Sequence, residues 1–165
     1  MKYLTYFRPN EELSDLILRQ NHLELPGSGL HSTLCFFYME SEHENKLISD
    51  LSQISFNPFE IETLAFDDFD KDSLVLKLSR SKELLQLHKG IVAVVRDYTY
   101  EEFDAIAKQY FGDNYNPHLT ISKSSSGFDR SSKELIGRKD RIARYTLAKK
   151  EDGAWKEMQD FYSSG

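Results

Sequence analysis

One pattern of four residues occurs twice in this chain and constrains the fold more than any other feature. His31-Ser32-Thr33-Leu34 and His118-Leu119-Thr120-Ile121 each contain a histidine, a threonine two positions later and then an apolar residue. Each copy follows a loop and begins a segment typical of a β-strand. Because side chains two apart on a strand point to the same face, each copy presents one imidazole and one hydroxyl together. If the copies act together, the fold must bring two distant strands to one cleft.

The rest of the sequence alternates between strand-like and helix-like spacing of apolar residues. Strands are predicted at residues 2–7, 32–39, 59–65, 74–78, 118–122, 142–148 and 154–161. Helices are predicted at residues 11–20, 42–54, 81–95, 101–110 and 131–136. The alternation of short strands and helices indicates a mixed fold of α and β elements.

Three details of these segments can be tested by a structure. Both sides of the strand at 32–39 are largely apolar, which predicts a central place in its sheet, and strict alternation puts Cys35 on the face of Thr33. The acidic run 67–72 is expected to be a solvated loop joining a hairpin, and it lacks the glycine and terminal glutamate of a calcium loop. Residues 151–153 are expected to form the last turn.

Composition limits the class of protein. The chain has 165 residues, the length of one ordinary domain, and its formal net charge of -6 disfavours general binding of nucleic-acid duplexes. Cys35 is the only cysteine, so neither an internal disulfide nor a thiolate metal cage is expected. The opening segment 1–10 lacks the apolar core of a signal peptide, and no run is long enough to cross a membrane. These features predict a soluble protein of the reducing cytoplasm.

The paired motifs suit acid–base chemistry on a phosphate ester. The ordinary imidazole pKa of about 6.5 lets neutral and protonated rings coexist near neutral pH. One histidine can therefore remove a proton from the attacking oxygen while the other protonates the leaving oxygen. The threonine hydroxyls can donate hydrogen bonds to the non-bridging phosphate oxygens. His31 and His118 are thus the candidate catalytic residues, and Thr33 and Thr120 the candidate phosphate-binding residues.

The two motifs resemble the signature of the two-histidine (2H) phosphoesterase superfamily, near its 2'-5' RNA ligase-like branch. The context is also similar, since the second motif follows Pro117 and is followed by Lys123. The resemblance extends from Lys2 to about Phe161 and is strongest at the motifs. It maps the family's catalytic histidines onto His31 and His118, its phosphate-binding hydroxyls onto Thr33 and Thr120, and makes Lys123 a further candidate for substrate binding.

The resemblance also implies a fold and an activity. The fold expected is α+β, a single two-lobed domain over residues 1–165, with pseudo-twofold duplicated antiparallel sheets and flanking helices around a central cleft. The activity expected is hydrolysis of 2',3'-cyclic phosphates to 2'-phosphates without metal or cofactor. The partner would be an RNA end with a cyclic phosphate or a small cyclic nucleotide, and the protein is expected to be a monomer.

Other interpretations of the same residues stay open. The motifs are also compatible with ligation of 2'-5' RNA ends, with binding of an RNA end or nucleotide without turnover, or with structural coincidence. The remaining histidines, which are His22, His43 and His88, have no matching neighbours and are expected to be non-catalytic controls. Cys35 has no partner base in a motif and is expected to pack in the floor of the cleft. Aromatic residues such as Phe7, Phe37 and Tyr115 are expected to pack in the core.

Overall fold

The computed structural model describes residues 1–20, 23–70 and 72–165. In chain order its elements are β1 (Lys2–Phe7), α1 (Glu11–Leu18), β2 (Ser32–Tyr38), α2 (Glu44–Leu51), β3 (Phe59–Phe69), β4 (Ser73–Leu78), α3 (Lys82–Arg96), α4 (Glu102–Tyr110), β5 (His118–Ser122), β6 (Lys139–Ile142), β7 (Arg144–Glu151) and β8 (Ala154–Tyr162). Two short 3₁₀ helices, η1 (Ser41–His43) and η2 (Gly112–Asn114), precede α2 and β5. Most of the predicted elements are therefore present.

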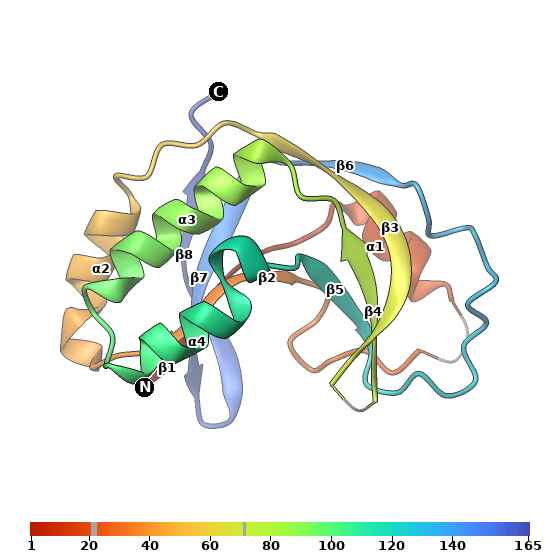
Figure 1. Ribbon diagram of the computed structural model, residues 1–165, viewed down its shortest axis with the longest axis horizontal. Coiled ribbons are helices and arrows are strands. Elements are labelled where there is room, and N and C mark those ends of the chain that lie inside the picture. The colour runs from red at the N-terminus through yellow and green to blue at the C-terminus, as the bar shows by residue number, and fades with distance from the viewer. Residues whose placement is uncertain (21–22, 71) are drawn as a thin grey trace.

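Two four-stranded antiparallel sheets form the frame of the molecule (Figure 1). The first sheet has the order β2-β1-β7-β8, and the second has the order β5-β4-β3-β6. The two orders are equivalent, because each begins with a motif strand and continues with the strand that precedes it in the chain. Strands β2 and β5 also contact each other, so the two edges that carry the motifs meet. This arrangement confirms the predicted α+β fold with duplicated antiparallel sheets.

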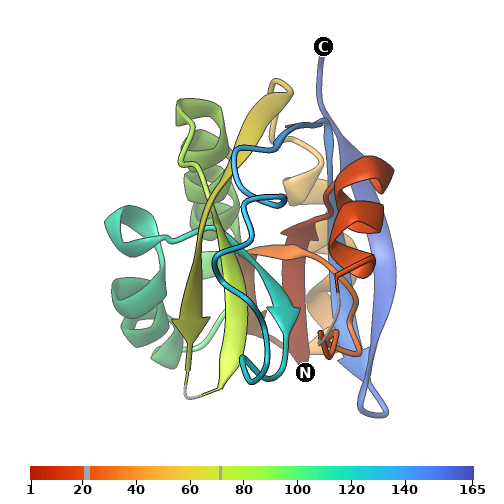
Figure 2. The same cartoon turned by 90° about the vertical axis from the view of Figure 1, so that its right-hand side faces the viewer.

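Helices α1 and α3 each lie against the sheet that does not contain the strand before them, so the two helices are exchanged between the sheets. Helix α3 follows β4 of the second sheet, yet it packs on β2 of the first. Helix α1 follows β1 of the first sheet but lies near β6 of the second, where Asp140 accepts a hydrogen bond from the backbone N–H of Asn10 at 2.6 Å. Figures 1 and 2 show α3 and α4 on one side of the molecule and α1 on the other. The exchange ties each half of the sequence to both sheets.

One cluster of buried side chains extends across both sheets. It includes Tyr3 and Leu34 of the first sheet, Ile61 and Leu76 of the second, and Leu87 of α3. Phe7 and Phe59, one from each sheet, meet edge to face with ring centroids 5.6 Å apart. Burial of this apolar surface is the dominant favourable contribution to folding, and it is shared between the sheets.

The segment before the C-terminal hairpin differs from the prediction. The strand predicted at 142–148 is two strands, because β6 pairs with β3 in the second sheet and β7 pairs with β1 in the first. The helix predicted at 131–136 is a series of turns. Thr63 explains this local structure, since its hydroxyl donates to the Leu135 carbonyl and accepts from the Arg138 N–H. These bonds satisfy backbone groups that a helix would have paired internally.

The loop between β3 and β4 is shorter than the predicted loop at residues 67–72. Strand β3 continues to Phe69, so Asp67 and Asp68 pair with β4 and only the tip of the hairpin turns. Lys71 of the acidic run lies outside the described residues. The turn at residues 151–153 is confirmed, and Asp152 and Gly153 have positive φ values of 51° and 80°. Such an Asp-Gly pair suits a two-residue hairpin turn whose twist matches the strands.

Candidate active site

The two motif histidines stand at equivalent places with equivalent hydrogen bonds. His31 lies immediately before β2, and its Nδ1 is 3.0 Å from the Gly29 carbonyl. His118 is the first residue of β5, and its Nδ1 is 2.8 Å from the Asn116 carbonyl. A carbonyl can only accept, so each Nδ1 carries the proton that it donates. This leaves Nε2 of both rings as the nitrogen that can exchange a proton with a substrate.

The charge state of the pair follows from burial and from neighbouring charges. Burial lowers the pKa of His31, and the nearby charges of Arg8 and His118 lower it further, while the Gly29 carbonyl opposes them. Burial also lowers the pKa of His118, but the Asn116 carbonyl and the Asp70 carboxylate oppose the shift. The Asp70 carboxylate thus favours the protonated form of His118, whereas the Arg8 guanidinium disfavours that of His31.

A β-bulge follows the threonine in both motifs. Thr33 pairs with Tyr6 and Cys35 with Thr5, so Leu34 is the extra residue in β2. Thr120 pairs with Val75 and Ser122 with Leu74, so Ile121 is the extra residue in β5. Both extra residues are fully buried. The apolar fourth position of the motif therefore anchors a bulge that bends the strand just beyond the reactive side chains.

The structure corrects two predictions about β2. Beyond Leu34 the faces are exchanged, so Phe36 lies with Thr33 in one cavity, while Cys35 is buried on the other side. Burial raises the pKa of the Cys35 thiol well above its ordinary value, consistent with a packing role. The strand is also at an edge of its sheet instead of the centre. Its two apolar sides are explained by α3 and by β5, which cover it.

Two cavities lie beside the motifs. One, of about 190 Å³, contains Thr33 and His118 among aromatic residues that include Phe36, Phe69 and Tyr110. It is called the His118 cavity below. The other, of about 610 Å³, is lined by His31 together with residues of β1 and of the β7–β8 hairpin, and is called the His31 cavity. Because Thr33 and His118 line one cavity, the structure brings together side chains from both motifs.

The threonine hydroxyls are partly exposed and available to a ligand. Thr120 shares a strand face with His118, and Thr33 lies opposite Tyr6, whose ring centroid is 5.1 Å from that of His31. Within residues 1–20, 23–70 and 72–165, no hydrogen bond to the Oγ1 of Thr33 or Thr120 is recorded. Each hydroxyl can therefore donate to an oxygen of a bound anion without losing a protein partner.

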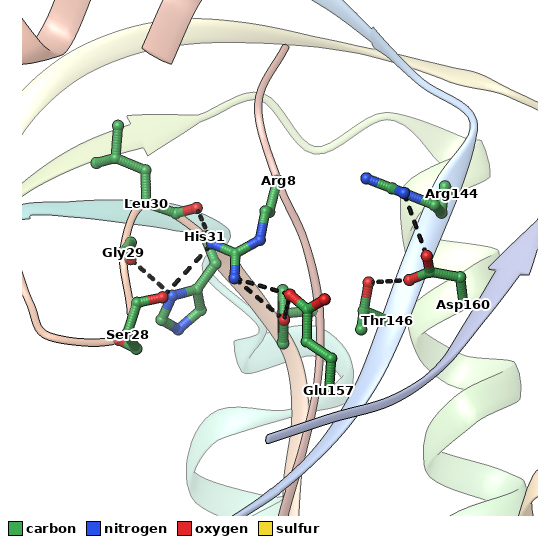
Figure 3. Close-up of polar contacts among 10 residues, drawn as sticks. Arg8, Ser28, Gly29, Leu30, His31, Arg144, Thr146, Glu157 and Asp160 are labelled. Atoms are coloured by element: carbon green, nitrogen blue, oxygen red, sulfur yellow. Dashed lines mark hydrogen bonds and ion pairs between the residues drawn. The ribbon is translucent and has the colours of Figure 1, made fainter. Parts of the chain in front are cut away.

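Arg8 is a component of the site that sequence patterns did not identify. Its guanidinium donates to the carbonyl of Leu30 at 3.1 Å and to that of Ser28 at 3.4 Å (Figure 3). It also donates to Glu157 at 3.1 Å and to the Tyr6 hydroxyl at 3.2 Å. Arg8 thus holds the loop from which Gly29 receives the His31 Nδ1–H. The only sequence feature that could have indicated Arg8 is its position, as a positively charged residue directly after the first strand.

The pseudo-twofold relation gives Arg8 a counterpart. Tyr6 lies opposite Thr33 and Val75 opposite Thr120, so Lys77 occupies in β4 the place that Arg8 has after β1. Lys77 is the cross-strand partner of His118, which puts both side chains on one face. It is also 3.8 Å from the Asp67 carboxylate. Each histidine therefore has one cation beside it.

Lys123 is not placed with the other predicted residues. Strand β5 ends at Ser122, and the Lys123 backbone N–H donates to the Glu24 carbonyl at 2.8 Å. Its side chain is exposed and lines neither of the two cavities. In the pseudo-twofold relation its counterpart after the first motif is Phe36, which does line the His118 cavity. A substrate-binding role for Lys123 stays a prediction.

The other histidines have distinct surroundings. His88 is fully buried, where its Nδ1 donates to the Leu34 carbonyl at 2.8 Å and its Nε2 accepts from the Gly112 N–H at 3.0 Å. Burial lowers its pKa to about 4, so it is neutral and structural. His43 is at the surface near Tyr98. His22 lies outside the described residues. His43 is therefore a suitable control residue, whereas His88 is not.

The aromatic residues predicted to pack in the core do so. Phe7, Phe37 and Tyr115 are all buried, and Tyr115 stacks on His88 with ring centroids 3.9 Å apart. In the described part of the chain no group of three or more His, Cys, Asp or Glu side chains is placed to hold a metal ion. None of the helices within that part is both long and apolar enough to span a membrane.

Comparison with known proteins agrees with this geometry. A family model described as the 2'-5' RNA ligase superfamily matches residues 11–139, which is more than half of the chain. No curated protein sequence matches the chain significantly. The superfamily consists of phosphoesterases and RNA ligase-like enzymes, as the motif resemblance implied.

Several solved structures share the fold. TT0787 of Thermus thermophilus superposes with a TM-score of 0.74 at 18% identity, covering 100% of this chain and 99% of its own. LigT of E. coli, in complex with 3'-AMP, gives a TM-score of 0.69 at 14% identity and covers 99% of this chain and 98% of its own. Usb1 of Kluyveromyces marxianus gives 0.53 at 12% identity, with coverage of 94% and 96%. By its matched family model, its motifs and its fold, this chain belongs to the 2'-5' RNA ligase superfamily.

Proposed function

We propose that this protein is a metal-independent phosphodiesterase that opens 2',3'-cyclic phosphates to 2'-phosphates. The observation that carries the proposal is the repeated histidine environment at two strands in contact. Each imidazole gives its Nδ1–H to the carbonyl two residues earlier and keeps Nε2 for a substrate. Two such nitrogens beside threonine hydroxyls supply the acid, the base and the anion donors that opening of a phosphodiester requires. LigT, which shares the fold, has been crystallised with a nucleoside monophosphate, 3'-AMP.

The charges around the two rings support an assignment of roles. Burial and Arg8 disfavour the protonated form of His31, so the neutral ring that takes the proton is assigned to His31. Asp70 favours the protonated form of His118, so the ring that gives the proton is assigned to His118. His31 Nε2 takes a proton from water as the water oxygen bonds to phosphorus. The bond from phosphorus to the ribose 3' oxygen breaks, and His118 Nε2 gives that oxygen its proton, which leaves a 2'-phosphate and a 3'-hydroxyl.

The decisive experiment replaces each histidine in turn. His31→Ala and His118→Ala are each expected to lower kcat on a 2',3'-cyclic nucleotide by ~10²–10⁴, because each removes one proton relay. His43→Ala is the matched control, since His43 is at the surface and lines neither cavity, and it should retain full activity. EDTA should leave turnover of the unaltered chain unchanged. Full activity in both motif variants would reject the proposal, and binding without product would identify a non-catalytic module.

The pH dependence gives an independent test. One ring must be neutral and the other protonated, so kcat/KM should be bell-shaped, with apparent pKa values that belong to the pair. Burial lowers both pKa values in the free protein, so the maximum is expected below pH 6.5, the ordinary pKa of histidine. A rate that rises steadily from pH 5 to pH 9 would contradict a mechanism with two imidazoles.

A further inference from the structure

The His31 cavity is larger than one phosphate or one nucleoside requires, and nothing in the proposed reaction uses most of it. Its volume of about 610 Å³ is about three times that of the His118 cavity, at 190 Å³. It lies between β1 and the β7–β8 hairpin, and His31 is part of its lining. Its lining residues are Tyr6, Arg8, His31, Lys150, Trp155 and Glu157, with smaller contributions from neighbouring loops.

The indole of Trp155 is an aromatic ring of this cavity that the protein supports. Trp155 is half-buried and packs on a small apolar cluster that contains Leu4, Tyr6 and Ala148. One side of the indole is therefore held by the protein, and the residue also lines the cavity. A supported aromatic ring that faces a cavity is the usual platform on which an unpaired nucleobase stacks.

The charges of the cavity are suited to phosphates. Arg8 is balanced by Glu157, and Tyr6 donates to the same carboxylate at 2.8 Å. Lys150 has no carboxylate within ion-pair distance among the described residues, so its charge is available to a ligand. The Lys2 ammonium does not line the cavity, but it lies 6.0 Å from the Trp155 ring centroid and forms no ion pair within those residues. An aromatic ring with cations beside it that form no ion pair suits a single nucleic-acid strand. Bases stack on the ring, and the cations bind the phosphates.

We propose that the His31 cavity binds the nucleotide next to the terminal one, so that the substrate is the 3' end of an RNA strand. The inference rests on the proposed function, which places the reacting phosphate between His31 and His118. A 2',3'-cyclic phosphate requires a ribose with both hydroxyls, so the strand is RNA. The terminal base has the small aromatic His118 cavity available to it, and the preceding nucleotide continues toward His31, with its base on Trp155 and its phosphate at Lys150.

Kinetics on two substrates test this inference. The unaltered chain should have a higher kcat/KM for a trinucleotide ending in a 2',3'-cyclic phosphate than for a 2',3'-cyclic mononucleotide. Trp155→Ala is expected to lower the ratio of the two values about 10-fold, as loss of one stacked base would do. Lys150→Ala should lower the same ratio and weaken its dependence on salt. An unaltered chain without preference for the trinucleotide, or variants that keep the original ratio, would overturn the inference.

Lys156→Ala is the matched control for Lys150→Ala. Lys156 belongs to the same hairpin and carries the same charge, but it pairs with Lys149 on the other face and does not line the cavity. It should leave both kcat/KM values unchanged. An equal loss in Lys156→Ala and Lys150→Ala would mean that the charge of the hairpin, and not contact in the cavity, is responsible, and it would reject the role of Lys150.

Fluorescence separates this inference from the catalytic proposal. Trp155 is the only tryptophan in the chain, so its emission reports on this cavity directly. A 3'-phosphorylated RNA trinucleotide should quench the emission at concentrations at which a nucleoside 3'-monophosphate does not. Quenching without any hydrolysis would support the cavity and reject the enzyme, whereas hydrolysis without quenching would reject the cavity alone. Equal quenching by both probes would also overturn the strand assignment.

Discussion

In the proposed mechanism, Thr33 and Thr120 stabilise charge on the phosphate, whereas the histidines move protons. Their partly exposed hydroxyls stand near the imidazoles, and each can donate to a phosphate oxygen whose charge grows in the transition state. Thr33→Val and Thr120→Val keep the branched shape that suits a strand and remove only the hydroxyl. Each is expected to lower kcat/KM by ~10²-fold, measured on a cyclic nucleotide. An unchanged kcat/KM in both variants would show that these hydroxyls do not contact the phosphate.

Arg8 acts on His31 in two separable ways, through its charge and through its hydrogen bonds. The charge lowers the pKa of His31, so its removal in Arg8→Met should raise that pKa and move the acidic limb of kcat/KM to higher pH. The bonds to Ser28 and Leu30 hold the loop, so both Arg8→Met and Arg8→Lys should lower kcat about 10-fold through misplacement of His31. Arg8→Lys keeps the charge and should keep the acidic limb in place. The same shift of this limb in both variants would contradict the effect of the Arg8 charge, and an unchanged kcat in both would contradict its positioning role.

At the level of elements, His88 connects helix α3 to the segments that carry both motifs. It bonds to the Leu34 carbonyl in β2 and to the Gly112 N–H before β5. Tyr115, which stacks on it, donates to the Thr33 carbonyl at 3.0 Å. The elements α3, β2 and η2 thus share one buried polar group. Its loss should disturb the approach of the two strands as well as the stability of the fold.

The pH dependence of stability follows from the same residue. His88 has a pKa of about 4 in the fold and about 6.5 when unfolded, so the unfolded chain binds the extra proton between these values. Stability is fully present above pH 6.5 and is lost as the pH falls toward 4, by about 3 kcal/mol over that window. His88→Gln has no proton to gain and should be less stable at pH 7 but flatter between pH 6.5 and 4. Urea unfolding of both chains checks this, and parallel pH curves would contradict it.

At the scale of the whole molecule, both sheets should unfold together. The buried cluster crosses both sheets, the helices are exchanged, and the chain passes from the second sheet to the first between β6 and β7. Trp155 fluorescence reports on the first sheet, and far-ultraviolet circular dichroism reports on both. Their urea transitions are expected to coincide, as they do for a two-state domain. A second transition seen only by circular dichroism would show that the second sheet unfolds separately.

The sequence alone determined most of the local structure and named the candidate residues of the site. The spacing of apolar residues located most strands and helices, because strand and helix periodicities are properties of neighbouring residues. The repeated motif identified His31, Thr33, His118 and Thr120, because residues two apart on a strand necessarily share a face. Two predictions from such local patterns were wrong: the helix at 131–136 and the strand face of Cys35.

The tertiary structure alone decided how these parts meet. Pairing with different partners divides residues 139–151 between two sheets, and a bulge at Leu34 reverses the faces of β2 beyond the motif. Arg8 reaches the His31 loop, and His88 connects α3 to the segments that carry both motifs, through contacts with residues far away in the chain. Hydrogen bonding between strands and packing across sheets depend on residues that are distant in sequence, so no local pattern could specify them.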